Sequence, residues 1–271
     1  MVRGAGLLTH TDETICHRFS ELAAEKWDLH THENVVGSHQ DGETIVLEFD
    51  DGETITADAF VFAVGHSARD TFEALHNRGV PMDRKPFAIG VRIEHPQSLI
   101  DRTLYGRHAG HPQLGAAPYK FVSHCPNGRV AFSFCMCPGG LVVAATSEAG
   151  QVVTNGMSSY ARAEANANSG FMVEVKEEDF PGEHPLAGVK LQRELERKAY
   201  VLGGSNYQAP AQKLGDFMRN KASTAQGSVE PSYKPGVTWT NVRDCLPGFV
   251  SETIALAVQQ IERQIPGFAI E

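Results

Sequence analysis

The stretch ITADAFVFAVGHSARDTF, residues 55–72, places a strand-like run directly before a glycine and a helix-like segment. Residues 60–64 are all apolar, which is typical of a buried strand, and Gly65 allows the backbone to turn sharply after it. Ligands bind at the carboxyl ends of strands in open α/β sheets. This stretch is therefore either an ordinary strand-to-helix turn or one wall of a binding site.

The residues around this stretch predict the rest of an N-terminal domain. The segment GETIVLEFDDGETITADAF alternates in polarity on both sides of Asp50-Asp51-Gly52, which predicts a β-hairpin. The helix predicted over 68–78 ends at Gly79, and Pro81 follows closely. We place a domain boundary in the linker at 82–86, so the predicted domains are 1–83 and 84–271.

Beyond the linker the pattern changes to closely spaced strands. Because the spacing leaves little room for crossover helices, it favours an antiparallel sheet over further βαβ units. Three helices are expected later in the chain, over 184–204, within APAQKLGDFMRNK and over 251–265 with Ser251 as N-cap. The predicted strands lie in FAIGVRIEH, YKFVSHC, GRVAFSFCMC and GLVVAATS.

Composition excludes several classes of function. The 271 residues carry a net charge of −9, which argues against a nucleic-acid-binding protein because such proteins neutralise phosphates with clustered Lys and Arg. No apolar run is long enough to cross a bilayer, and the N-terminus is too polar for a secretory signal. Five cysteines do not suggest a disulfide framework, so a cytoplasmic protein is expected, with neither nucleic acid nor membrane as partner.

Familiar catalytic motifs are missing from the sequence. It contains no HExxH, GxSxG, Walker loop or GxGxxG. Cys135-Met136-Cys137 lacks the second pair that a zinc site requires, so we predict no metal site and interpret these cysteines as buried or pocket-lining thiols. The segment 137–170, rich in glycine and small polar residues, forms either tight turns in an antiparallel sheet or a binding surface.

Several of these segments together resemble bacterial FAD-dependent dehydrogenases described as NAD(FAD)-utilizing, from about His32 to the C-terminus. In that family a doubly wound FAD domain is interrupted by an inserted substrate domain with an antiparallel sheet. The resemblance thus implies a two-dinucleotide-binding-type flavoprotein of class α/β plus α+β. The segments that carry it are AVGHSARDTF, KPFAIGVRIEHPQ, YKFVSHCPNGRVAFSFCMCPGG, VVAATSEAGQVVTNGMSSYARAEANANSG, ELERKAYVLGG and APAQKLGDF.

The resemblance also implies a cofactor site. FVFAVG is similar to the second FAD motif of such proteins, in which a strand passes its glycine close to the cofactor. On this interpretation the backbone of residues 63–66 approaches the adenosine and pyrophosphate of FAD, and residues 33–36 lie on the neighbouring strand near the adenine. NAD(P)H is a possible electron donor, although no second dinucleotide fingerprint is visible. The implied cofactor-binding residues are Val36, Ala63, Val64, Gly65 and His66.

The sequence departs from this family at both ends. Family proteins begin with a βαβ unit carrying GxGxxG and end with a glycine-rich segment that contacts the flavin, and neither is present here. We therefore expect the chain to correspond to the central part of such a protein. Its FAD domain would be incomplete and would leave a sheet edge uncovered.

Two functions follow from this interpretation. The first is a portion of an FAD-dependent oxidoreductase whose inserted domain positions a small-molecule substrate against FAD. Arg162 would orient an anionic substrate, and Cys135 and Cys137 are weak catalytic candidates. The alternative is a non-catalytic binding module that a separate, complementary flavoprotein segment completes. The predicted substrate-binding residues are Gly139, Gly140, Asn155, Ser158 and Arg162.

Overall fold

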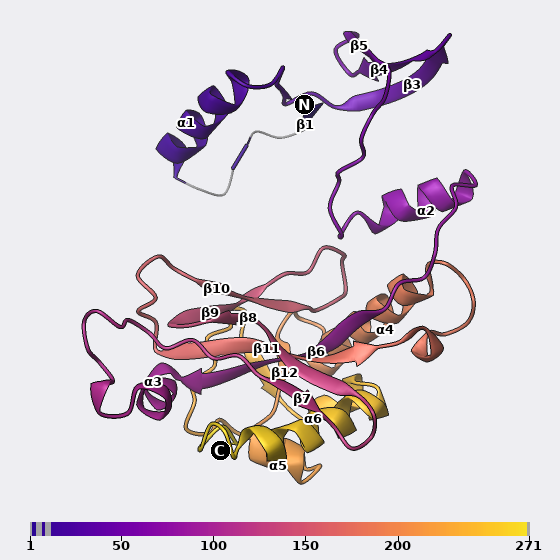
Figure 1. Ribbon diagram of the computed structural model, residues 1–271. Coiled ribbons are helices and arrows are strands. Elements are labelled where there is room, and N and C mark those ends of the chain that lie inside the picture. The colour runs from indigo at the N-terminus through magenta and orange to yellow at the C-terminus, as the bar shows by residue number, and fades with distance from the viewer. Residues whose placement is uncertain (1, 4–6, 9–11, 270–271) are drawn as a thin grey trace. The chain divides into compact units, whose positions relative to one another are not determined.

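The computed structural model describes residues 2–3, 7–8 and 12–269, and its chain forms two compact units (Figure 1). The first unit is Met1–His66 and the second is Ser67–Glu271. Among the described residues, no helix combines the length and the apolar character that crossing a membrane requires.

In its described residues, the first unit has one helix and two small sheets. Strand β1 (Val2–Arg3) pairs in parallel with β2 (His30–Thr31), and α1 (Glu13–Ala24) lies between them in sequence. The second sheet is antiparallel, in the order β3 (Val35–Asp41), β4 (Thr44–Phe49) and β5 (Thr54–Ala57). The predicted hairpin around Gly52 is confirmed as β4–β5, and Gly52 turns with a φ of +89°.

The prediction of a strand over residues 60–64 is wrong. Residues 59–65 have no regular secondary structure, and the last strand of the first unit, β5, ends at Ala57. Val61 is 89% exposed and Phe62 is 71% exposed. An apolar run becomes a buried strand only when a neighbouring strand pairs with it, and no described strand pairs with this one.

Helix α2 (Arg69–Asn77) confirms the predicted helix and belongs to the second unit. The two compact units divide between His66 and Ser67, whereas the sequence pattern places the boundary at 83/84. The physical reason is Arg69, whose side chain is buried against the carboxylates of Glu148 and Glu196. These ion pairs join α2 to the rest of the second unit.

The second unit is built around a four-stranded antiparallel sheet, as predicted. Its order is β6 (Phe87–Pro96), β11 (Asn166–Val175), β8 (Val130–Cys137) and β7 (Val122–His124). Strand β11 pairs with β6 along ten residues. It begins within the glycine-rich segment 137–170, so this segment supplies part of a central strand as well as turns.

One face of this sheet carries the main core. Ile89, Val91 and Ile93 on β6 and Phe171 on β11 belong to the cluster that includes the buried side chains of α3 (Gln97–Tyr105) and α6 (Gly248–Ile261). Figure 1 shows α6 on one side of the sheet and the pair β9 (Gly140–Ala144) and β10 (Thr154–Ser158) on the other. Strands β9 and β10 are antiparallel to each other.

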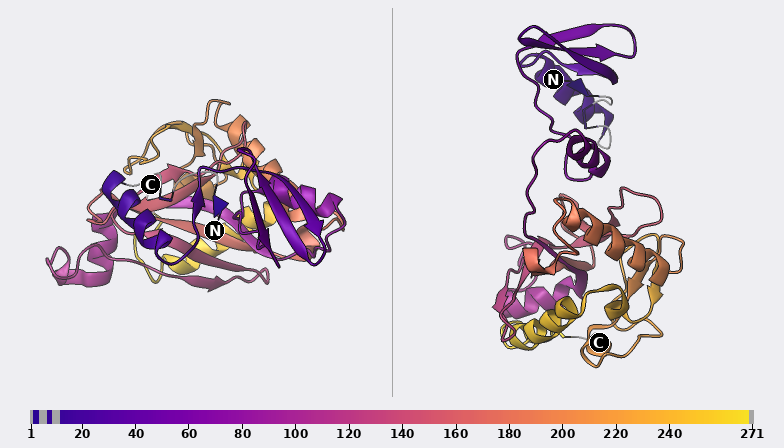
Figure 2. Two further views of the ribbon diagram at one scale, coloured as in Figure 1. Left: turned by 90° about the horizontal axis from the view of Figure 1, so that it is seen from above. Right: turned by 90° about the vertical axis from the view of Figure 1, so that its right-hand side faces the viewer.

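The remaining helices lie where the sequence predicts them, although their first and last residues differ from the prediction. Helix α4 (Ala187–Leu202) lies within the predicted 184–204. Helix α6 begins at Gly248 rather than Ser251, because Pro247 is its N-cap and Ser251 is buried inside it. The segment APAQKLGDFMRNK is only partly helical. The remaining elements are β12 (Ala209–Ala211), α5 (Leu214–Met218), β13 (Val237–Trp239) and the short 3-10 turns Gly106–His108, Glu177–Asp179 and Val242–Cys245. Figure 2 shows the ribbon from two further directions.

Candidate functional site

A β-bulge interrupts β8 at the two cysteines that the sequence brings to attention. Asn168 of β11 stands opposite Cys137 and Gly170 stands opposite Phe134, so two β8 residues, Cys135 and Met136, face a single residue of β11. Cys135 has a φ of +49°, a left-handed conformation that residues other than glycine rarely adopt. The bulge exposes Cys135 while Cys137 remains buried.

Arg92 of β6 stabilises this bulge from across the sheet. Its Nη2 donates to the carbonyl oxygen of Cys135 at 2.7 Å and to Sγ of Cys137 at 3.3 Å. Its Nε donates to Oδ1 of Asn168 at 2.9 Å. The half-buried guanidinium thus connects three strands of the sheet. We refer to Arg92, Cys135, Cys137, Gly156 and Asn168 as the Arg92 cluster.

Glycines allow the β9–β10 pair to lie close over this face of the sheet. A Cβ built on Gly156 of β10 would lie 1.7 Å from Nη2 of Arg92 and 2.3 Å from Oδ1 of Asn168. At Gly139, where φ is +46°, a Cβ would lie 1.9 Å from the carbonyl oxygen of Arg162. Only glycine fits at these positions, because the protein's own atoms occupy the space that a Cβ would need.

The structure brings some of the predicted substrate-binding residues together and leaves others at the surface. Gly139 and Gly140 are buried at the β8–β9 turn, and the Ser158 hydroxyl donates to the carbonyl oxygen of Pro138 at 2.8 Å. Asn155 is exposed, and its side chain accepts from the amide of Gly156 at 2.8 Å. These roles in substrate binding stay predictions.

Arg162 contributes its backbone rather than its charge to this region. Its carbonyl oxygen lies against Gly139. Arg162 itself is exposed and has a φ of +50°. The cation that the structure places beside the two cysteines is Arg92.

The protonation of Cys137 follows from its surroundings. Burial raises the pKa of the Cys137 thiol, and the nearby Arg92 charge offsets part of this effect. The thiol donates to the carbonyl oxygen of Cys135 at 3.3 Å. Cys137 is therefore a protonated hydrogen-bonding group at neutral pH. Within the described residues, no group of three or more His, Cys, Asp or Glu side chains could hold a metal ion.

Sequence reasoning missed Arg92, Asn168 and Gly156. The signal for Arg92 was present in the alternation of FAIGVRIEH, where Ile89, Val91 and Ile93 pack into the core and the residues between them face the other way. An arginine on the second face of a central strand points to a polar layer above it. Asn168 carried no comparable signal, because the residues of ANANSG are small or polar and have low β-propensity.

The predicted cofactor-binding residues all belong to the first unit and lie at its surface. Val36 on β3 is 65% exposed and Val64 is 54% exposed. Ala63 and His66 are exposed as well. Gly65 has a φ of +83°, and nothing lies within 4 Å of a Cβ built on it. The backbone at Gly65 is therefore accessible to a ligand, and the glycine is required here by its conformation rather than by a close neighbour.

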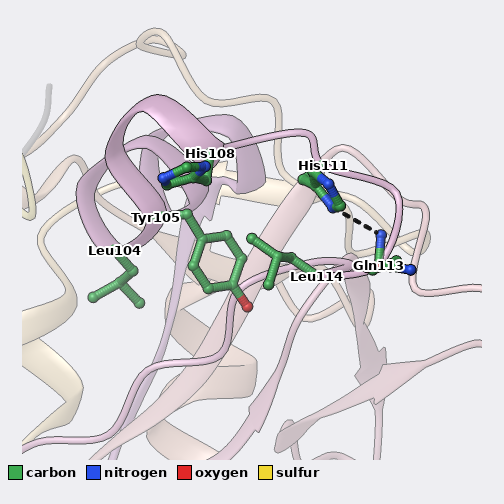
Figure 3. A pocket seen from close by; sticks show the side chains of 6 residues that line it. All are labelled: Leu104, Tyr105, His108, His111, Gln113 and Leu114. Atoms are coloured by element: carbon green, nitrogen blue, oxygen red, sulfur yellow. Dashed lines mark hydrogen bonds between the residues drawn. The ribbon is translucent and has the colours of Figure 1, made fainter.

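A separate shallow pocket of about 430 Å³ lies at the end of α3. Figure 3 shows Tyr105 and Leu114 beneath the imidazoles of His108 and His111. Nδ1 of His111 accepts from the amide of Gln113 at 3.3 Å. The segment HAGH, residues 108–111, thus contributes two imidazoles to one concavity.

Relatives of known sequence extend these observations. An uncharacterized protein of Clostridium beijerinckii is 48% identical over 237 residues, which cover 86% of this chain and 44% of that protein. Mycothione reductase of Mycobacterium tuberculosis is 41% identical over 83 residues, 31% of this chain and 18% of that protein. The chain thus spans less than half the length of these curated relatives.

The likeness to solved structures is weak, whereas a family model covers most of the second unit. A salicylate hydroxylase substrate complex aligns with a TM-score of 0.27 and 15% identity, covering 62% of this chain and 36% of that one, a likeness too weak to carry an argument. The family model described as FAD-dependent protein, C-terminal domain-like, matches residues 86–271. On this match the chain belongs to the FAD-dependent protein, C-terminal domain-like family.

Proposed function

We propose that this chain is the substrate-binding portion of an FAD-dependent oxidoreductase of the dehydrogenase type. The observation that carries the proposal is the Arg92 cluster, in which a half-buried cation lies on one face of the central sheet and donates to the carbonyl oxygen of the exposed residue Cys135. The opposite face of the sheet is filled by core side chains. Membership of an FAD-dependent family supports the cofactor.

The residues of the first unit fit one requirement of a flavin site. An extended dinucleotide needs backbone that it can approach closely, and Gly65 offers open space beside an accessible backbone. In this proposal Val36, Ala63, Val64, Gly65 and His66 contact the adenosine side of the cofactor. FAD would supply the redox chemistry, with NAD(P)H as the proposed electron donor.

The second unit would bind and orient the substrate. Arg92 supplies a fixed positive charge, since its three hydrogen bonds to Asn168, Cys135 and Cys137 hold the guanidinium in one position. Cys135 lies at the exposed side of the bulge. Gly139, Gly140 and Ser158 maintain the β8–β9 turn next to it.

Titration of the purified chain with FAD tests this function. Quenching of flavin fluorescence should show binding near one FAD per chain. Gly65→Ala should weaken it, because the side chain strains a backbone at φ +83° and enters the space beside the cofactor. Gly52→Ala is the matched control, since Gly52 is also exposed, has a φ of +89° and faces open space. Equal effects of both substitutions, or no binding by the unsubstituted chain, would contradict the proposal.

A second candidate function is that of a binding module completed by a separate chain. The exposed run at residues 60–64 favours it, because its backbone makes no hydrogen bond to a described residue and Val61 and Phe62 are largely exposed. Such an edge is a template for pairing with a strand of another protein. The proposed partner is a complementary flavoprotein segment that carries a GxGxxG motif.

Reconstitution distinguishes this candidate from the first. The chain is mixed with the part of the Clostridium beijerinckii relative that lies outside the 44% matched by this chain, and FAD retention is measured by gel filtration. This candidate predicts that flavin is retained only in the mixture and that Phe62→Asp abolishes retention. Val201→Asp on α4 is the matched control, because Val201 is also an exposed apolar residue, 63% exposed, but lies within a regular helix. Retention by the chain alone would refute this candidate.

A further inference from the structure

We propose that Arg92 and Asn168 bind a carboxylate group of the substrate. This inference deepens the proposed function, since it rests on the Arg92 cluster being the substrate site. It names the chemical class of the group that the site recognises.

The first argument is the charge of Arg92. Arg69, Arg129 and Arg193 are also partly or fully buried, and each pairs with at least one carboxylate. In the described part of the chain Arg92 forms no ion pair, and its hydrogen bonds go to the neutral acceptors of Asn168, Cys135 and Cys137. A positive charge removed from water is unfavourable unless an anion compensates it. The site therefore favours an anionic ligand.

The second argument is an unsatisfied donor beside this charge. Asn168 is fully buried, and its Oδ1 is occupied by Nε of Arg92. Its Nδ2 has no hydrogen-bond partner in the described part of the chain. Nη1 of Arg92 likewise makes no hydrogen bond to a described residue. Buried donors are almost always paired, so this orphaned amide indicates a missing acceptor.

A carboxylate fits the remaining donors better than other anions. Nε and Nη2 of Arg92 are already used by Asn168, Cys135 and Cys137, so the donors left for a ligand are Nη1 of Arg92 and Nδ2 of Asn168. A carboxylate has two acceptor oxygens, one for each of these donors. Gly156 limits the space, since even a Cβ there would lie 1.7 Å from Nη2 of Arg92. A flat group is therefore favoured over a tetrahedral phosphate. It would enter from the side of exposed Cys135, with a small movement of β10 to admit it to the buried amide.

The test uses the full chain without flavin and sodium benzoate as the probe. Isothermal titration calorimetry should detect binding of benzoate to the chain. Benzamide and inorganic phosphate should both bind with much lower affinity than benzoate. Benzoate should also slow modification of Cys135 by a thiol reagent severalfold, measured in a Cys16→Ser background because Cys16 is the other thiol that is not buried. Phosphate binding more tightly than benzoate would overturn the choice of carboxylate.

Substitutions separate recognition from structural support. Arg92→Met should weaken benzoate binding roughly tenfold or more, as expected for lost charge-assisted hydrogen bonds. Arg197→Met is the control, since Arg197 is an exposed arginine of α4. Asn168→Asp keeps the size of the side chain and places a carboxylate beside Arg92. It should abolish benzoate binding and raise the melting temperature, because an internal anion then compensates Arg92.

Several results would overturn the inference. These are no benzoate binding by the unsubstituted chain at tens of millimolar, unchanged binding in Arg92→Met, or binding retained in Asn168→Asp. Loss of binding in Arg162→Met with full binding in Arg92→Lys would assign the anion to the other arginine. FAD titration probes Gly65 in the first unit, whereas benzoate probes the second unit. Failure of one measurement is thus distinguishable from failure of the other.

Discussion

Replacement of Arg69 by methionine should destabilise the second unit strongly. The Arg69 side chain is 9% exposed, and its guanidinium forms a bidentate pair with Glu196 at 2.7 and 3.0 Å. It also donates to Glu148 at 2.8 Å. Methionine retains much of the apolar stem but removes the charge. Both carboxylates then lose a partner in a partly desolvated position.

The magnitude follows from what each carboxylate retains. Glu148 keeps its pair with Arg193, whose Nε and Nη2 both donate to it. Glu196, whose side chain is only 14% exposed, forms its ion pair with Arg69. Breaking one buried pair and leaving one uncompensated charge costs about 3 kcal/mol. For a unit of this size, that corresponds to a fall in melting temperature of about 6–12 °C.

Urea unfolding followed by far-ultraviolet circular dichroism measures this loss. Lys198→Met is the matched control on α4, the helix that carries Glu196, because Lys198 pairs with Glu194 at the surface with both side chains about half exposed. Its cost should stay below about 0.5 kcal/mol. If Arg69→Met changes the free energy of unfolding no more than Lys198→Met does, the reasoning that Arg69 fastens α2 to the second unit is refuted.

Three further outcomes are expected. His95 is buried with its pKa lowered to about 4 by desolvation, so only the unfolded state gains its proton as pH falls below 6.5. Between pH 6.5 and 4, the free energy of unfolding of the unsubstituted chain should therefore fall by about 3 kcal/mol more than that of His95→Phe, measured by urea titration. Equal dependence of the two free energies on pH would contradict this. Arg193 first, and Arg69 next, hold the pKa of Glu148 at about 2, below its usual 4.5. The stabilisation that this lowered pKa gives is complete above pH 4.5 and is lost as the pH falls towards 2. In thermal melts, the melting temperature of Arg193→Met should therefore depend less on pH over this range than that of the unsubstituted chain. Gly156→Ala should cost about 1–3 kcal/mol by denaturant unfolding, because its Cβ collides with Arg92; an unchanged midpoint would show that β10 yields freely.

The parts of the fold that sequence predicts best are those governed by local chemistry. The β4–β5 turn needs a positive φ at Gly52, and Gly79 terminates α2 in the same conformation. Strands β6 and β8 are marked by their apolar runs. These features depend on residues adjacent in the chain, so a sequence pattern is enough to place them.

Other features depend on contacts between distant residues. Residues 60–64 have the composition of a buried strand but remain exposed, because composition cannot show whether a partner strand is present. Strand β11 begins in a glycine- and asparagine-rich stretch and is central only because β6 and β8 pair with both of its edges. The Arg92 cluster likewise joins β6, β8, β10 and β11, which no local spacing could reveal.

The central claim is that substrate binds to the face of the sheet that carries the Arg92 cluster, and side-chain nuclear magnetic resonance tests it most directly. In ¹⁵N-labelled protein, the Nδ2 protons of Asn168 and the Nε proton of Arg92 report on this face alone. Addition of benzoate should shift both signals with one common saturation curve. Saturable shifts confined to the pocket lined by His108 and His111, with the Asn168 and Arg92 signals unmoved, would contradict the account.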